Sequence, residues 1–228
     1  MKQILLGFLI ALLFAIEGFG QPKSVSVPVN KSGDTTGYYK VMRQRIAQMK
    51  MHDPLASNDA LLLRVSCENW SVEVRSINLK TISGSVYFFT RKAGTPGGNG
   101  GGEFFFKKKR MSRSKALAIN QSFQKYEIAS IPDQKDIRRW PLGSDGMDYL
   151  IEHKDRSTYT FKTYWEPSSS RYEIKEAAAI YGFIREIEST LELPAAFLTF
   201  LNKLPRGTYH TGGITAYTNT GKKGKARK

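Results

Sequence analysis

The sequence predicts an α+β domain: a mostly antiparallel sheet with two C-terminal helices packed on one face, plus a short N-terminal helix. Three observations favour this class. Apolar residues over 61–75 alternate with polar ones at the two-residue period of strands. Apolar residues over 38–49, and again after residue 170, follow helical spacing. Strands that are followed by helices, rather than regularly interleaved with them, are typical of α+β domains.

The N-terminus has the pattern of a secretory signal peptide. One lysine, Lys2, precedes an apolar run of 13 residues from Ile4 to Ile16, and small residues lie at Gly18 and Gly20. A membrane-spanning helix needs roughly 20 apolar residues, so this run is short for an anchor. We therefore expect a signal peptide over 1–20, export to the periplasm or the medium, and no permanent membrane anchor.

Composition limits the class of protein that follows the signal. The chain is 40% hydrophobic and 24% charged, which is typical of a globular domain rather than a disordered one. Cys67 is the single cysteine, so no internal disulfide can form and the core must supply the stability. The formal net charge is +15. Most of that excess lies in two short segments, 107–115 and 222–228, which indicates a local electrostatic surface.

The first half of the chain predicts a leader, a helix and three strands. Residues 21–36 are polar, contain Pro22 and Pro28, and indicate a flexible leader. The amphipathic helix over 38–49 follows. Strands are then predicted from Leu61 to Cys67, from Trp70 to Arg75 and from Val86 to Phe89, the first of them half-buried and the last apolar on both faces. Cys67 falls on the apolar face of its strand, as a small core residue.

A glycine-rich stretch divides the chain. Residues 94–102 are rich in glycine and run into Glu103 and Phe104–Phe106, without the lysine and helix start that a phosphate-binding loop requires. We expect a mobile hairpin loop. Residues 114–131 fit a helix or a strand equally, and Pro132 ends them. Residues 38–92 and 103–207 form either one domain or two closely packed halves.

A hairpin is predicted over Tyr149–Trp165, with a three-residue turn at 155–157 that pairs His153 with Tyr159 and Ile151 with Phe161. This register predicts a buried face and a solvent face. The buried face comprises Tyr149, Ile151, Phe161 and Trp165, and the solvent face comprises Glu152, Lys154, Thr160 and Lys162.

Two helices close the predicted domain. Ser170 and Glu173 have the spacing of a capping box, and an apolar stripe from Ile174 to Leu191 follows it. Pro194 suits the first turn of a second helix, whose apolar face would include Phe197 and Leu201. The resulting organisation is a signal peptide at 1–20, a leader at 21–36, a single α+β domain at 37–217 and a disordered basic tail at 218–228.

The candidate binding residues are six cations within nine positions. They are Lys107, Lys108, Lys109, Arg110, Arg113 and Lys115. Lysines at a sheet edge also prevent unwanted strand pairing, but that role accounts for one or two of them rather than six. The three histidines lie far apart, so metal-ligand spacing is absent, and no nucleophile motif occurs. We predict no catalytic residue, no metal site and no cofactor.

The charge pattern favours a binding or interaction domain over an enzyme. The partner classes that match the basic segment are an anionic glycan, a lipid head group and an acidic protein at the cell envelope or outside it. Export argues against nucleic acid as the partner. Two alternatives remain open: a structural envelope protein with incidental charge, and an enzyme whose site is dispersed over loops. The oligomeric state is not predicted.

Overall fold

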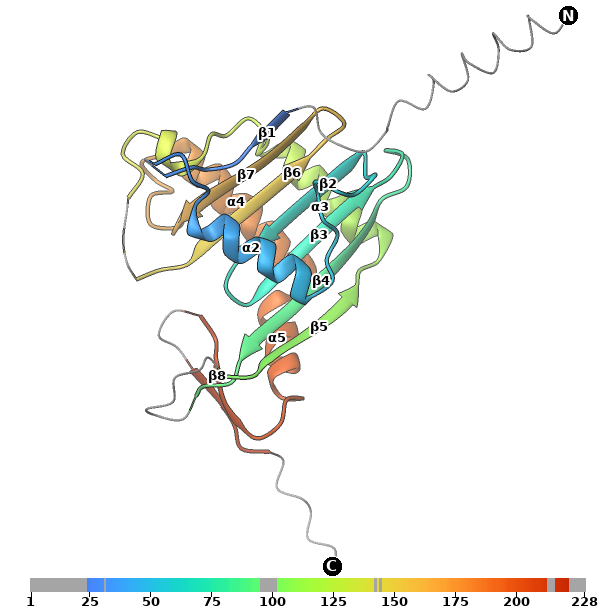
Figure 1. The fold of residues 1–228 in the computed structure, drawn as a ribbon, viewed down its shortest axis with the longest axis vertical. Coiled ribbons are helices and arrows are strands. Elements are labelled where there is room, and N and C mark those ends of the chain that lie inside the picture. The colour runs from blue at the N-terminus through green and yellow to red at the C-terminus, as the bar shows by residue number, and fades with distance from the viewer. Residues whose placement is uncertain are drawn as a thin grey trace, which may run out of the picture.

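The computed structural model describes residues 24–30, 32–94, 102–141, 143, 145–212 and 216–221. The segment predicted as a signal peptide, 1–20, lies outside them. Among these residues, seven strands form one sheet in the order β1-β7-β6-β2-β3-β4-β5 (Figure 1). The strands are β1 Ser24–Ser26, β2 Leu61–Ser66, β3 Trp70–Ser76, β4 Ser83–Arg91, β5 Phe104–Arg110, β6 Asp148–Lys154 and β7 Thr158–Trp165. Neighbouring strands are antiparallel except β1 and β7, which confirms the predicted α+β class with a mostly antiparallel sheet.

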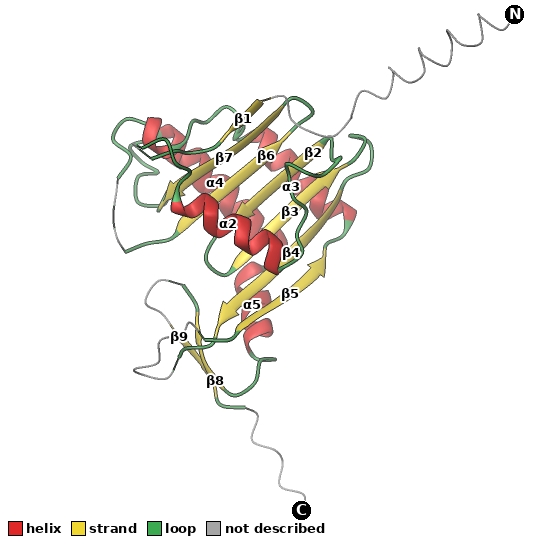
Figure 2. Cartoon of the chain, viewed as in Figure 1, coloured by secondary structure: helices red, strands yellow, loops and turns green. Residues whose placement is uncertain are grey.

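Helices cover both faces of this sheet (Figure 2). The helices are α2 Gly37–Gln48, α3 Arg113–Lys125, α4 Lys175–Leu191 and α5 Leu193–Leu201. One core cluster joins α3, α4 and α5 to one face through residues such as Ile119, Phe183 and Phe200. A smaller cluster joins Met42 and Ile46 of α2 to the other face. A short 3-10 helix, Gln134–Asp136, lies before β6.

Strand β2 is buried on both faces, although its alternation predicted a half-buried strand. Leu63 and Val65 belong to the larger core cluster, and so does Cys67, which confirms that the cysteine is a small core residue. Arg64 points to the opposite face, where α2 and the segment after it cover the sheet, and its side chain is fully buried. The second face of β2 is buried because α2 covers it, and the residue pattern within β2 alone does not reveal that helix.

The predicted hairpin forms between β6 and β7, but its register differs by one residue from the prediction. Tyr159 pairs with Lys154 instead of His153, and Lys162 pairs with Ile151. Residues 155–157 connect the two strands, as predicted, but the N–H of Asp155 donates to the carbonyl of Thr158 at 3.0 Å. The Asp155 carboxylate in turn accepts hydrogen bonds from the backbone N–H groups of residues 157 and 158, both at 2.7 Å. The predicted face assignment was therefore wrong.

Two predicted solvent-facing residues of this hairpin are buried. Glu152 and Lys154 share the α2 side of the sheet with Phe161, and each is 1% exposed. Lys154 donates to the carbonyl of Ser57 at 2.6 Å. Phe161 is buried as predicted, but against α2 rather than beside Ile151.

The closing helices begin differently from the prediction. Residues 170–173 form turns, in which the Ser170 carbonyl accepts from the N–H groups of Glu173 and Ile174, so the predicted capping box is not formed. The N-cap of α4 is Ile174, without a side-chain hydrogen bond. Pro194 lies in the first turn of α5, as predicted. The ambiguous segment is helical: the Ser112 hydroxyl caps α3 by accepting from the N–H of Lys115.

Segments at both ends of the domain contain strands that the sequence did not indicate. Strand β1 lies within the predicted flexible leader and pairs with β7. A two-stranded ribbon, β8 Gly207–His210 and β9 Ala216–Asn219, follows α5 and extends into the first two residues of the predicted tail. Residues 222–228 of that tail, and residues 95–101 of the predicted glycine loop, lie outside the described part. Strands from both sides of the glycine loop share the seven-stranded sheet.

Candidate anion-binding groove

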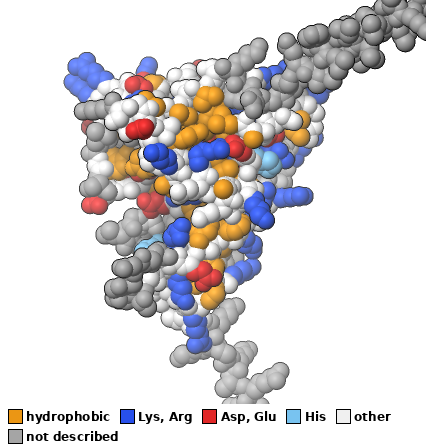
Figure 3. Space-filling model, viewed as in Figure 1, with side chains coloured by type: hydrophobic (Ala, Val, Ile, Leu, Met, Phe, Trp, Pro, Cys, Tyr) orange, Lys and Arg blue, Asp and Glu red, His pale blue; other side chains and the backbone are white. Residues whose placement is uncertain are grey.

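The basic segment forms the edge of the sheet. Strand β5 pairs only with β4 among the described strands, and alternate lysines point to opposite faces. Lys107 and Lys109 face α5, whereas the Nζ of Lys108 lies 5.2 Å from the ring centroid of Tyr87 on the α2 side. Figure 3 shows lysine and arginine side chains projecting along the edge that carries β5. The strand thus divides the predicted cluster between two surfaces.

A groove lies between β5 and the helices on the α5 side. It has a volume of ≈ 450 Å³ and continues into a smaller hollow of ≈ 220 Å³ beside the start of α3. Phe88, Leu191 and Ala196 line it as an apolar floor. Phe88 stacks on Phe200 with ring centroids 6.2 Å apart, so that floor is continuous with the core. The groove is therefore a fixed feature of the packing rather than a gap between loose side chains.

Four lysines line this groove. Lys107 and Lys109 come from β5, Lys115 from the first turn of α3, and Lys203 from the residues that follow α5. None of the four forms an ion pair with a carboxylate among the residues the structure describes. Glu192 is the one carboxylate along the lining, so the lining carries a net charge of +3. Uncompensated cations over an apolar floor are suited to an amphipathic anion.

The turn between α4 and α5 builds one wall of the groove. Glu192 ends α4 with φ 53°, in the left-handed region, and α5 begins at the next residue. Pro194 then occupies the first turn of α5, where a missing backbone N–H costs nothing. This abrupt change of direction brings Lys203, at the end of α5, to the groove that Lys107 lines.

The structure gathers four of the six predicted binding residues around the groove and its smaller hollow. Lys107, Lys109 and Lys115 line the groove, and Arg110 lines the hollow. Lys108 lies on the other face, and Arg113 donates to the carbonyl of Lys80 at 3.4 Å. Sequence reasoning missed Lys203 and the apolar floor, because their contribution depends on how α5 packs.

A second group of charges lies buried on the α2 side. Arg64 donates to Glu73 at 2.8 Å and to Glu152 at 2.6 Å, and Tyr159 donates to Glu152 at 2.7 Å. The Nδ1 of His52 lies 2.6 Å from the other Glu73 oxygen. Burial raises the pKa of Glu73, but the hydrogen bond from His52 and the charge of Arg64 together lower it to about 2.

This buried group, Arg64–Glu73–Glu152–Tyr159, is a structural network rather than a site for a ligand. Arg64 has its Nε and both Nη atoms bonded to carboxylates or to the His52 carbonyl, and its side chain is 0% exposed. The opposing carboxylates are 2% exposed. A histidine beside a glutamate is a common acid–base pair, but here the glutamate is committed to a buried guanidinium.

We also searched the described part of the chain for metal sites, a reactive thiol and membrane-spanning helices. Groups of three or more His, Cys, Asp or Glu side chains that would hold a metal do not occur there. Burial raises the pKa of the Cys67 thiol to about 12. Among the described helices, none combines the length and the apolar character needed to cross a membrane. Comparison with protein-family models, with curated proteins and with solved structures finds no match to this chain.

Proposed function

We propose that this protein is an exported, non-enzymatic binding domain that holds an anionic partner in the groove between β5 and α5. The observation that carries the proposal is the convergence of four lysines from three segments on one apolar floor. The preferred partner is an anionic glycan, lipid head group or acidic protein that places an apolar face on Phe88 and its charges on the lysines.

The groove lysines come from distant parts of the chain, which supports a binding role over incidental charge. Lys203 lies more than 80 residues from Lys115, yet both line one groove, and neither is neutralised by a carboxylate within the described residues. A lysine-rich edge strand explains exposed cations on β5 alone. It does not explain why a cation at the end of α5 joins them beside an aromatic floor.

The test compares two double variants that remove the same charge from the same part of the chain. Lys107→Gln with Lys109→Gln changes the groove, whereas Lys108→Gln with Arg113→Gln changes cations outside it. Retention is measured on immobilised heparin and on vesicles with and without phosphatidylglycerol. The groove variant is expected to elute at clearly lower salt than the control variant.

A neutral variant separates groove shape from charge. Ala195 is exposed and lines the groove, so Ala195→Trp fills it without altering net charge. Surface changes of this kind usually shift stability by no more than about 0.5 kcal/mol. Reduced retention of Ala195→Trp supports the groove. Equal loss in the two double variants, with no effect of Ala195→Trp, would mean that only net charge attracts the matrix, and the structural alternative would then be preferred.

A further inference from the structure

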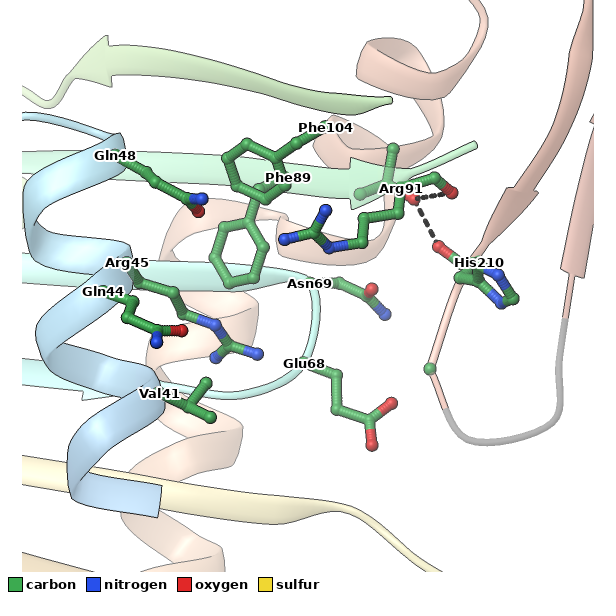
Figure 4. A pocket seen from close by; sticks show the side chains of 12 residues that line it. Val41, Gln44, Arg45, Gln48, Glu68, Asn69, Phe89, Arg91, Phe104 and His210 are labelled. Atoms are coloured by element: carbon green, nitrogen blue, oxygen red, sulfur yellow. Dashed lines mark hydrogen bonds between the residues drawn. The ribbon is translucent and has the colours of Figure 1, made fainter. Parts of the chain in front are cut away.

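A second pocket lies on the opposite side of the sheet from the groove and shares no lining residue with it. Its volume is ≈ 270 Å³, and its walls come from α2, the turn between β2 and β3, and the adjoining ends of β4 and β5. Thr90 of β4 donates to the carbonyl of His210, which joins the ribbon to the pocket wall (Figure 4). Five segments of the fold thus enclose one small space.

Two arginines extend into this space from different elements. Figure 4 shows Arg45 of α2 and Arg91 of β4 pointing toward the same region, with the ring of Phe89 beside them. The Arg45 guanidinium lies 4.8 Å from the centroid of Phe89, and that of Arg91 lies 5.2 Å from the centroid of Phe104. Stacking on an aromatic ring occupies the flat face of a guanidinium and leaves its N–H edge available to an acceptor.

Both arginines of the pocket donate hydrogen bonds to backbone carbonyls. Among the described residues, Arg45 and Arg91 form no ion pair, and their hydrogen bonds go to the carbonyls of Cys67 and Gly102, at 3.0 Å and 3.4 Å. Burial lowers the pKa of Arg45, while the nearby charges of Glu68 and Arg91 act on that pKa in opposite directions, Glu68 raising it and Arg91 lowering it. Arg64, the fully buried arginine on this side of the sheet, pairs with two carboxylates instead. An anion bound between the two guanidiniums would therefore offset the repulsion between their charges.

The lining limits the charge and the size of that anion. Glu68 is the one carboxylate among the described lining residues, and it leaves a net charge of +1 from Arg45 and Arg91, which matches a monoanion better than a dianion. The volume is just below the roughly 300 Å³ at which sites for drug-sized ligands begin. Phe89 and Phe104 offer a flat apolar surface, and a guanidinium matches the two oxygens of a carboxylate.

We propose that this pocket binds a small monocarboxylate with a flat apolar body, held by Arg45 and Arg91 through its carboxylate and by Phe89 and Phe104 through its body. The pocket is separate from the groove, so this inference does not depend on the proposed function. Arg91 is exposed and joins the pocket from the end of β4, so it can be replaced without disturbing the core.

The probe is phenylacetate, and phenylacetamide is its neutral analogue of the same shape. Binding to the full chain is measured by calorimetry and by saturation-transfer NMR. Phenylacetate is expected to bind, with the amide and the Arg91→Gln variant each weakening the interaction at least about tenfold, as for loss of a charge-assisted hydrogen bond. Arg138→Gln, a loss of the same charge at an exposed site elsewhere, is expected to bind normally.

Three outcomes would overturn the inference. They are an absence of phenylacetate binding, equal binding of acid and amide, and unchanged binding by Arg91→Gln. Displacement of phenylacetate by inorganic phosphate at equal concentration would also overturn the carboxylate assignment, because it would show a general anion site. The Lys107→Gln, Lys109→Gln variant should bind phenylacetate normally, so a failure of the groove and a failure of this pocket are distinguishable.

Discussion

Replacing Arg64 with methionine tests whether the buried network supports the fold. The substitution keeps an unbranched apolar stem but leaves Glu73 and Glu152 buried without their shared cation. Three hydrogen bonds from the guanidinium to carboxylates are lost. Removing one partner of a buried ion pair typically costs about 3–5 kcal/mol. For a domain with a typical stability of about 5–15 kcal/mol, this is a large fraction of the total.

The assay is urea unfolding of wild type and Arg64→Met, with Arg43→Met as the matched control. Arg43 also forms a bidentate pair, with Asp53 at 2.6 and 2.7 Å, but both side chains are about one-third exposed. Exposed pairs contribute about 0–1 kcal/mol, so the control should lose little. If Arg64→Met costs no more than Arg43→Met, the network does not stabilise the fold and our reasoning is wrong.

The dependence on pH has a defined sign. In the wild type the pKa of Glu73 is about 2, so its contribution is present above the ordinary pKa of a glutamate and is lost only as the pH falls toward 2. In Arg64→Met, burial without the guanidinium should raise the pKa of Glu73. A raised pKa means that stability is present in acid and is lost as the pH rises. The deficit of Arg64→Met should therefore be smaller at about pH 5 than at about pH 8.

Two further predictions concern packing. Cys67 is 2% exposed and burial raises its thiol pKa to about 12, so it should react with a thiol reagent only after the domain unfolds. Reaction of the folded protein at the rate of a free thiol would contradict this. Gly182→Ala should cost about 1–3 kcal/mol, because the new Cβ would lie 2.7 Å from the Tyr126 ring between α4 and α3. Gly37→Ala, where a Cβ meets nothing within 4 Å, is the control, and equal unfolding midpoints for the two variants would refute the close packing.

The sequence predicted those elements whose signals are local. The helix over 38–49 and the alternation over 61–75 depend on neighbouring residues, and both correspond closely to α2, β2 and β3. Pro194 predicted the start of α5 for the same reason. Because proline lacks a backbone N–H, it fits best in the first turn of a helix, and this preference does not depend on the tertiary structure.

The errors arose where side chains from distant segments decide the outcome. The predicted hairpin register placed Glu152 and Lys154 on the solvent face, and the structure buries both. They are buried because Arg64 and the carbonyl of Ser57 provide partners from β2 and from the segment after α2. A hydropathy pattern shows that a residue is charged, but it does not show whether a distant segment supplies a buried partner for that charge.

The sequence predicted only those residues of the candidate site that lie close together in the chain. The run of cations at 107–115 is visible in one short window, and four of its members line the groove or its hollow. Lys203 and Phe88 are separated from that window along the chain. Lys203 reaches the groove because the chain turns at Glu192, and no sequence motif predicted the left-handed conformation of that residue.

The row formed by Glu73, Arg64 and Glu152 has a consequence for how the sheet assembles. Arg64 is the direct register partner of both glutamates, across β3 on one side and β6 on the other. The pairing of β2 with β6 joins strands about 90 residues apart in the chain, so we expect it to form later than the local pairing of β2 with β3.

Strand pairing can slip by two residues without moving any side chain to the wrong face. One such slip would place Arg64 opposite Lys154 of β6, or opposite Arg75 of β3, and so bury like charges together. The opposite slip would place it against Leu150 or Ser71, and leave the guanidinium without an anion. Arg64 thus disfavours misaligned pairings of β2 with β3 and with β6 while the sheet forms. This effect is separate from any stability that Arg64 contributes to the finished fold.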